Sequence, residues 1–174
     1  MTKATSAAGG ARGRIQLERE FDAPIEDVWE LWTTAEGIES WWGPDGFSVK
    51  VRTLDLRVGG QLHYAMIATA KETVAFMKRE GMPTTTECQL RYTEVVPKVR
   101  LAYVHLADFI PGVAAYDVGT VIELQPTAAG ARMVMTFDAM HDEEWTERAV
   151  QGWQNELGRL EAALSARSAR GGSR

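Results

Sequence analysis

Hydrophobic and polar residues alternate along much of the chain, which predicts a protein built mainly from β-strands. In the first such stretch, residues 14–21, Ile15, Leu17 and Phe21 fall on one side and polar residues on the other. Apolar residues at every second position are typical of a strand with one buried face. Six further stretches follow, over residues 47–56, 61–69, 87–96, 99–106, 117–124 and 131–137. The pattern therefore predicts seven strands.

Two short helices are predicted directly after the first strand. Pro24 is tolerated at the start of a helix, and Val28, Leu31 and Trp32 then recur at the spacing of one helical face. Residues 35–41 form the second short helix, which a Gly-Pro-Asp-Gly turn cluster ends.

A long helix is predicted near the C-terminus, from about Asp142 to Ala166. Trp153 and Leu157 belong to an apolar stripe with helical spacing in this segment. Gly152 lies inside the stripe, where glycine costs up to ~1 kcal/mol relative to alanine. Its presence indicates either a close approach of helix and sheet or room for a ligand.

A shorter helical stretch, residues 71–80, interrupts the strands and is followed by Gly81 and Pro83. Val74 and Met77 form its small apolar face. A helix inserted between two strands at the rim of a cavity is predicted to be a mobile lid, with Val74 and Met77 turned inward. A decorated surface loop is the alternative.

The length of 174 residues is typical of one domain. Residues 14–166 are predicted to form it, and the Ala-, Gly- and Ser-rich segments 1–13 and 167–174 are predicted to be disordered tails. The net charge of −5 disfavours a nucleic-acid partner. Six Trp and seven Met exceed what a core of this size needs. Such side chains suit an adaptable apolar cavity, and plain core packing is an equally good interpretation.

Cys88 is the only cysteine, so no intramolecular disulfide is possible, as is usual in a reducing cytoplasm. No motif beside Cys88 indicates a nucleophile. The sequence also has no apolar run of the length that spans a membrane and no secretory signal. We therefore expect a cytoplasmic protein without membrane insertion.

Few residues indicate chemistry. The three histidines are far apart without other ligands at metal-site spacing, and no phosphate-binding loop is present, so no metal and no cofactor are expected. The candidates for catalysis are His105, on the face of Tyr103, and Glu94, before the bend at Pro97. Each has an ordinary alternative that is favoured over a catalytic role. His105 is a histidine at a strand end that reaches solvent, and Glu94 forms an ion pair at an edge or in a loop.

Five short motifs and the order of the elements resemble the START-like superfamily (birch-pollen-allergen-like, or SRPBCC). Within it, the chain is similar to the activator-of-heat-shock-protein-90-ATPase homologues. The motifs are, in chain order, 21–24 (Phe-Asp-Ala-Pro) with 28–29 (Val-Trp), 41–44 (Trp-Trp-Gly-Pro), 55–60 (Asp-Leu-Arg-Val-Gly-Gly), 92–97 (Tyr-Thr-Glu-Val-Val-Pro) and 152–153 (Gly-Trp).

The resemblance implies an α+β helix-grip fold. In it, a seven-stranded curved antiparallel sheet wraps around the long C-terminal helix, and two short helices follow strand one. It also implies a hydrophobic pocket between sheet and helix. It does not imply one activity, because relatives include lipid carriers, polyketide cyclases, stress-response proteins and co-chaperone domains.

We expect a small-molecule binding protein, monomeric or homodimeric, that holds an apolar or amphipathic ligand between the sheet and the C-terminal helix. The residues expected to line the cavity are Trp41, Trp42, Tyr64, Met66, Tyr92, Tyr103, His105, Met135, Phe137 and Trp153. One alternative is a cyclase- or hydrolase-type enzyme that uses His105 with a tyrosine or Glu94 in the same cavity. The other is a co-chaperone-like interaction domain, although such relatives carry an additional N-terminal domain that residues 1–13 do not replace.

Overall fold

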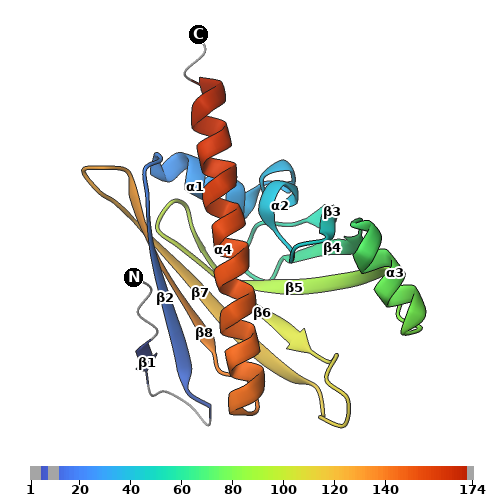
Figure 1. Ribbon diagram of the computed structural model, residues 1–174. Helices are drawn as coiled ribbons and strands as arrows, with labels where there is room; N and C mark the ends of the chain where they lie inside the picture. Colours follow the sequence, from blue (N-terminus) through green and yellow to red (C-terminus); the bar gives the residue numbers. More distant parts are fainter. Residues whose placement is uncertain (1–4, 8–11, 172–174) are drawn as a thin grey trace.

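The computed structural model describes residues 5–7 and 12–171 and shows an antiparallel sheet curved around a long helix (Figure 1). The strands are β1 (Thr5–Ala7), β2 (Arg14–Phe21), β3 (Phe47–Leu54), β4 (Gln61–Ala68), β5 (Thr85–Val96), β6 (Arg100–Ala107), β7 (Tyr116–Pro126) and β8 (Ala131–Asp138). The helices are α1 (Ile25–Thr33), α2 (Ala35–Trp41), α3 (Lys71–Arg79) and α4 (Glu143–Gly171). The predicted α+β helix-grip arrangement is confirmed.

The strands lie in the order β1-β2-β8-β7-β6-β5-β4-β3, and all neighbours are antiparallel. The seven predicted strands are present, and β1 is an addition to them. Thr5–Ala7 pairs with the edge of β2, within a segment that was predicted to be a disordered tail. Three residues are too few to produce a periodic pattern, so the sequence did not indicate this strand.

The C-terminal helix also extends further than predicted, to Gly171 instead of Ala166. Arg167 explains part of the extension, because its guanidinium donates to the backbone carbonyl of Asp27 and pairs with the carboxylate of Glu30 on α1. Residues 167–171 are therefore helical and are not part of a tail. The other residues of the two predicted tails, 1–4, 8–11 and 172–174, lie outside the described residues.

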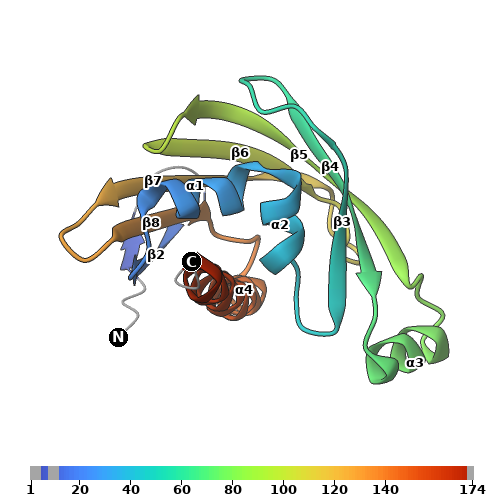
Figure 2. The same ribbon diagram turned by 90° about the horizontal axis from the view of Figure 1, so that it is seen from above.

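Helix α4 lies in the concave side of the sheet, and α1 and α2 cover one end of that side (Figure 2). Leu157, Leu160 and Leu164 of α4 are buried against the sheet, where Leu17 and Met135 are also fully buried. Burying side chains of this size stabilises the fold by about 1.5–3 kcal/mol each before conformational entropy is subtracted. The leucine stripe thus holds the helix in place.

The turn between α1 and α2 is tight because residue 37 is glycine. The backbone amide of Gly37 donates to the hydroxyl of Thr34, which caps α2. A Cβ atom at Gly37 would lie 2.3 Å from the carbonyl oxygen of Glu30, closer than real Cβ contacts come. The close approach of the two helices places Trp41 and Trp42 over the concave face.

A β-bulge in β5 changes which face of the sheet Glu94 occupies. Tyr92 pairs with Tyr103, but the register shifts at the next residue, and Glu94 pairs with Ala102. Side chains alternate between faces along a strand, so the extra residue moves Glu94 to the face opposite Tyr92 and Tyr103. The simple alternation in the sequence does not reveal the bulge.

Helix α3 is present where the sequence predicted a helix, but it lies at the end of the sheet formed by β3, β4 and β5. Both views show it well separated from α4 (Figures 1 and 2). Met77 is buried and Val74 is half-buried, and Thr73 packs against the turn at Gly46. The backbone N–H of Ala70 also donates to the carbonyl of Gly46 at 3.1 Å, so the start of α3 is held beside the turn that precedes β3.

Candidate functional site

Aromatic side chains fill the space between the sheet, α1, α2 and the middle of α4. The ring centroid of Trp32 lies 4.7 Å from that of Trp41 and 5.5 Å from that of Trp42. Trp153 of α4 joins this cluster, with its ring 6.1 Å from that of Trp42. The indole N–H of Trp41 donates to the carbonyl of Leu31 at 2.8 Å, so the cluster is also held by a buried hydrogen bond.

Most of the residues that were predicted to line a cavity belong to this closed core. At most 6% of each of the following is exposed: Trp41, Trp42, Tyr92, Tyr103, Met135 and Phe137. The other predicted residues, Tyr64, Met66, His105 and Trp153, are half-buried. The rings of Trp32, Trp41, Trp42 and Tyr103 pack against one another in this core. None of the residues predicted to line a cavity belongs to the lining of the cavity described below.

A buried polar pair lies within this core. Tyr103 and Thr120 face each other on β6 and β7, and neither hydroxyl meets the geometry of a hydrogen bond with any described residue. Burial raises the pKa of the Tyr103 phenol well above its usual value, and the neighbouring Thr120 hydroxyl offsets this only in part. Buried hydroxyls of this kind are rare, because an unmade hydrogen bond is costly.

Glu156 is a polar residue that sequence reasoning missed. Its Oε1 accepts a hydrogen bond from the backbone N–H of Gly43 at 3.0 Å. Burial raises the pKa of Glu156 to about 7, and the Gly43 hydrogen bond and the charge of Arg159 counteract this only in part. The available signal was its spacing of four residues from Gly152, which puts both on one face of α4.

Gly152 itself does not mark a close contact. A Cβ atom there would meet no atom within 4 Å. Of the two interpretations of this glycine, the close approach of helix and sheet is therefore wrong, and the glycine leaves open space beside the helix.

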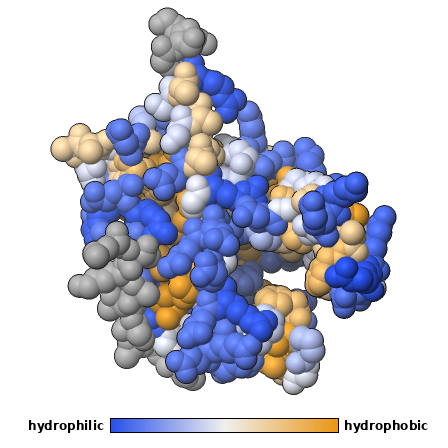
Figure 3. All heavy atoms as spheres, in the orientation of Figure 1, coloured by the Kyte–Doolittle hydropathy of each residue, from blue (hydrophilic) through white to orange (hydrophobic). Residues whose placement is uncertain are grey.

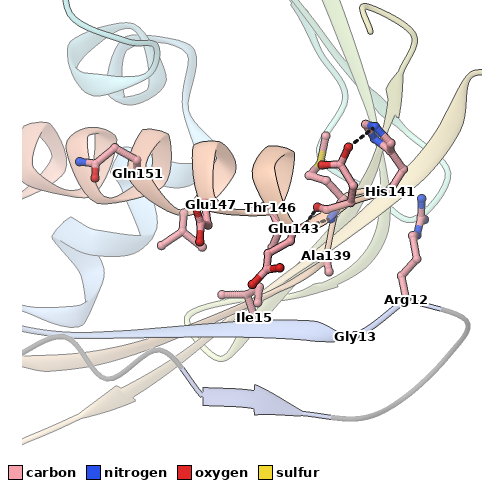
Figure 4. A pocket seen from close by; sticks show the side chains of 12 residues that line it. Arg12, Gly13, Ile15, Ala139, His141, Glu143, Thr146, Glu147 and Gln151 are labelled. Carbon is pink, nitrogen blue, oxygen red and sulfur yellow. Dashed lines mark hydrogen bonds and ion pairs between the residues drawn. The ribbon is translucent and has the colours of Figure 1, made fainter. Parts of the chain in front are cut away.

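A cavity lies on the flank of α4 that faces β2 (Figure 4). Its volume is about 660 Å³, and its walls are the start of β2, the connection from β8 to α4 and the first turns of α4. Ile15, Met140 and Val150 supply apolar side chains. Figure 3 shows apolar surface reaching the exterior beside this part of α4. This cavity is lined by other residues than those that the sequence analysis names.

The end of the cavity at the start of α4 is held by a network of hydrogen bonds. The hydroxyl of Tyr116 lies 3.0 Å from Nδ1 of His141, and Nε2 of the same ring lies 3.1 Å from a carboxylate oxygen of Asp142. The other oxygen of Asp142 caps α4 by accepting from the N–H of Trp145 at 2.8 Å. These contacts fix the rim, because they join β7 to the first turn of the helix.

The charged side chains of the cavity are predominantly acidic. Asp142, Glu143 and Glu147 contribute carboxylates, and Arg12 contributes the one guanidinium among the lining residues. The guanidinium of Arg12 donates to the carbonyl of Asp117 at 2.6 Å and stacks on a tyrosine ring. Glu143 and Glu147 make no hydrogen bond or ion pair with another described residue.

The two candidates for catalysis lie apart. His105 is half-buried on the concave face, and burial lowers its pKa, so the ring is neutral at pH 7. Glu94 lies on the other face and pairs with Arg100 at 2.7 Å. The bulge therefore places His105 and Glu94 on opposite faces of the sheet. Neither residue lines the cavity between α4 and β2.

Other features carry little chemistry. Burial raises the pKa of the Cys88 thiol, which disfavours a thiolate nucleophile. The described residues contain no group of three or more His, Cys, Asp or Glu placed to hold a metal ion. No helix in the described part of the chain is long and apolar enough to cross a membrane. Val74 and Met77 of α3 are not among the residues that line this cavity, and the lid stays a prediction.

The sheet, the long helix in its concave side and the cavity between them define a START-like helix-grip protein. The chain belongs to the family of activator of Hsp90 ATPase homolog 1-like proteins, whose model matches residues 22–165. None of the curated proteins compared matches the chain.

Solved structures support this assignment. A protein from Chromobacterium violaceum is 29% identical, with a TM-score of 0.71, over 87% of this chain and 96% of its own. A protein from Nitrosomonas europaea is 25% identical, with a TM-score of 0.69, over 92% of this chain and 99% of its own. A protein from Aeromonas hydrophila, described as AHSA1-like, is 22% identical, with a TM-score of 0.68, over 89% of this chain and 94% of its own. At this identity the likeness supports only the shared fold.

Proposed function

We propose that this protein binds a small amphipathic molecule in the cavity between α4 and β2. The observation that carries the proposal is the cavity itself. Its volume of about 660 Å³ falls within the range of small-molecule sites. Apolar side chains at its floor and carboxylates at its rim match a molecule with an apolar body and a polar end. The family assignment is compatible with this function, and a cytoplasmic location is part of the proposal.

Filling the cavity should abolish binding. Val150 is half-buried on the cavity wall, so Val150→Trp places an indole in the ligand space. Ala162→Trp adds the same side chain on the exposed face of the same helix and serves as the matched control. We expect the neutral dye Nile red to bind the wild type and Ala162→Trp, and to bind Val150→Trp at least about 10-fold more weakly.

Native mass spectrometry of the same three proteins, as purified from cells, extends this test. A co-purified apolar or amphipathic molecule should be retained by the wild type and Ala162→Trp and lost from Val150→Trp. Circular dichroism establishes whether Val150→Trp is folded. Equal Nile red affinity in a folded Val150→Trp protein would overturn the proposal.

Hydrogen exchange distinguishes the cavity from the predicted lid site. We expect bound Nile red to slow amide exchange in residues 143–151, because they form a wall of the cavity. Residues 71–79 of α3 should exchange at the same rate with and without the dye, because α3 lies at the other end of the sheet. Slower exchange confined to α3 would show that the ligand lies beneath that helix instead.

A further inference from the structure

The wall of the cavity formed by α4 carries a row of acidic and amide side chains that no cation of the described residues neutralises. Glu143, Glu147 and Gln151 are spaced four residues apart, so they form one stripe of the helix, and all of them line the cavity. Like charges at this spacing repel each other. A ligand with a positive charge beside Glu143 and Glu147 would remove that repulsion.

The adjacent stripe of the same helix shows the contrast. Glu144 there has Arg148 four residues later, and the two form an ion pair at 2.6 Å. In the stripe that lines the cavity, the residue four positions after Glu147 is Gln151, which cannot form such an ion pair. Glu143 also interacts favourably with the N-terminus of α4, but Glu147, one turn further on, lies beyond the first turn, where this effect acts.

The remaining charged groups of the cavity are already engaged. Asp142 caps α4 and pairs with His141, and Arg12 is bound to Asp117 and stacked on Tyr116. One guanidinium against three carboxylates gives the described lining residues a negative charge. The apolar side chains of Ile15 and Val150 lie in the same cavity.

We infer that the cavity selects amphipathic cations, because its lining combines a negative charge with an apolar floor. This inference rests on the proposed function. The ligand class is a protonated amine or a quaternary ammonium group attached to an alkyl or aryl body. The cationic group lies beside Glu143 and Glu147, and the apolar body lies against Ile15 and Val150.

The test compares three probes of equal chain length, used below their micellar concentrations. They are decyltrimethylammonium, decanol and decanoate, and their affinities are measured by isothermal titration calorimetry. We expect the cation to bind most tightly and decanoate most weakly, with a gap of roughly 10-fold or more, since attraction to the two exposed carboxylates of Glu143 and Glu147 is replaced by repulsion. Added sodium chloride should weaken only the binding of the cation towards that of decanol.

Charge variants identify the residues responsible. The double variant Glu143→Gln with Glu147→Gln should weaken binding of decyltrimethylammonium roughly 5-fold and leave decanol unchanged. Glu144→Gln, on the neighbouring stripe, should leave both affinities unchanged. If decanol and decanoate bind at least as well as the cation, the inferred selectivity is wrong while the cavity still binds ligands. If no probe binds the wild type, both the inference and the proposed function fail.

Discussion

Replacing Trp41 by alanine should lower the free energy of unfolding by about 3–5 kcal/mol, the usual range for truncating a large buried aromatic side chain. Trp41 is fully buried and lies against Trp32 and Trp42. Its removal leaves a space that α2 cannot easily close, because Gly37 already brings α2 against α1. The variant also removes the hydrogen bond to the carbonyl of Leu31. Urea unfolding followed by circular dichroism measures the change.

Two further variants separate packing from other effects. Trp41→Phe keeps an aromatic ring but removes the donor, so it should cost less than Trp41→Ala and more than a surface change. Phe109→Ala truncates a ring that is 58% exposed and should change stability by less than about 1 kcal/mol. A loss as small in Trp41→Ala as in Phe109→Ala would show that the aromatic cluster does not stabilise the fold.

The fold could be predicted from the sequence because its elements carry strong periodic patterns. The alternation in Arg14–Phe21 and the leucine stripe from Leu157 to Leu164 each indicate which side is buried, and tertiary packing then follows that side. The pattern fails where the backbone departs from regularity. The bulge before Glu94 places its side chain on the opposite face of the sheet from the one that simple alternation predicts. The strand Thr5–Ala7 is too short to show a pattern.

The location of the cavity could not be predicted for a different reason. The sequence indicates that Trp41, Tyr103 and Trp153 face the interior, and this is correct. Whether inward residues enclose a space or fill it depends on their volumes and on their neighbours from other elements, which periodicity does not give. Here the rings fill the space on one flank of α4. Smaller side chains such as Ile15 and Val150 leave it open on the other.

Glu156 shows the same limit for chemistry. Its position on α4 is evident from the sequence, but its burial is a result of the turn at Gly43, which comes from a distant part of the chain. Arg159 of α4 also donates to the carbonyls of Gly43 and Pro44. Glu156 and Arg159 therefore hold the end of α2 against α4, and the carboxyl of Glu156 is enclosed by that contact.

Replacing Glu156 by glutamine should therefore stabilise the protein at high pH. Burial raises the pKa of Glu156 from its usual 4.5 to about 7, so the folded state binds this proton more tightly than the unfolded state. Below pH 4.5 both states are protonated, and the wild type has no penalty; the penalty grows as the pH rises and is complete above about pH 7. Glutamine stays neutral and still accepts from Gly43. The variant should gain on the order of 3 kcal/mol at pH 8 and little at pH 4.

The measurement is the free energy of unfolding in urea, for the wild type and Glu156→Gln, at half-unit steps from pH 4 to pH 8. Glu161→Gln removes an exposed carboxyl from the same helix and should follow the wild type at every pH. The difference between Glu156→Gln and the wild type should rise through the interval between pH 4.5 and about 7 and then level off. A difference that is constant with pH, or that falls as the pH rises, would mean that the Glu156 carboxyl is ionised at no cost in the folded protein.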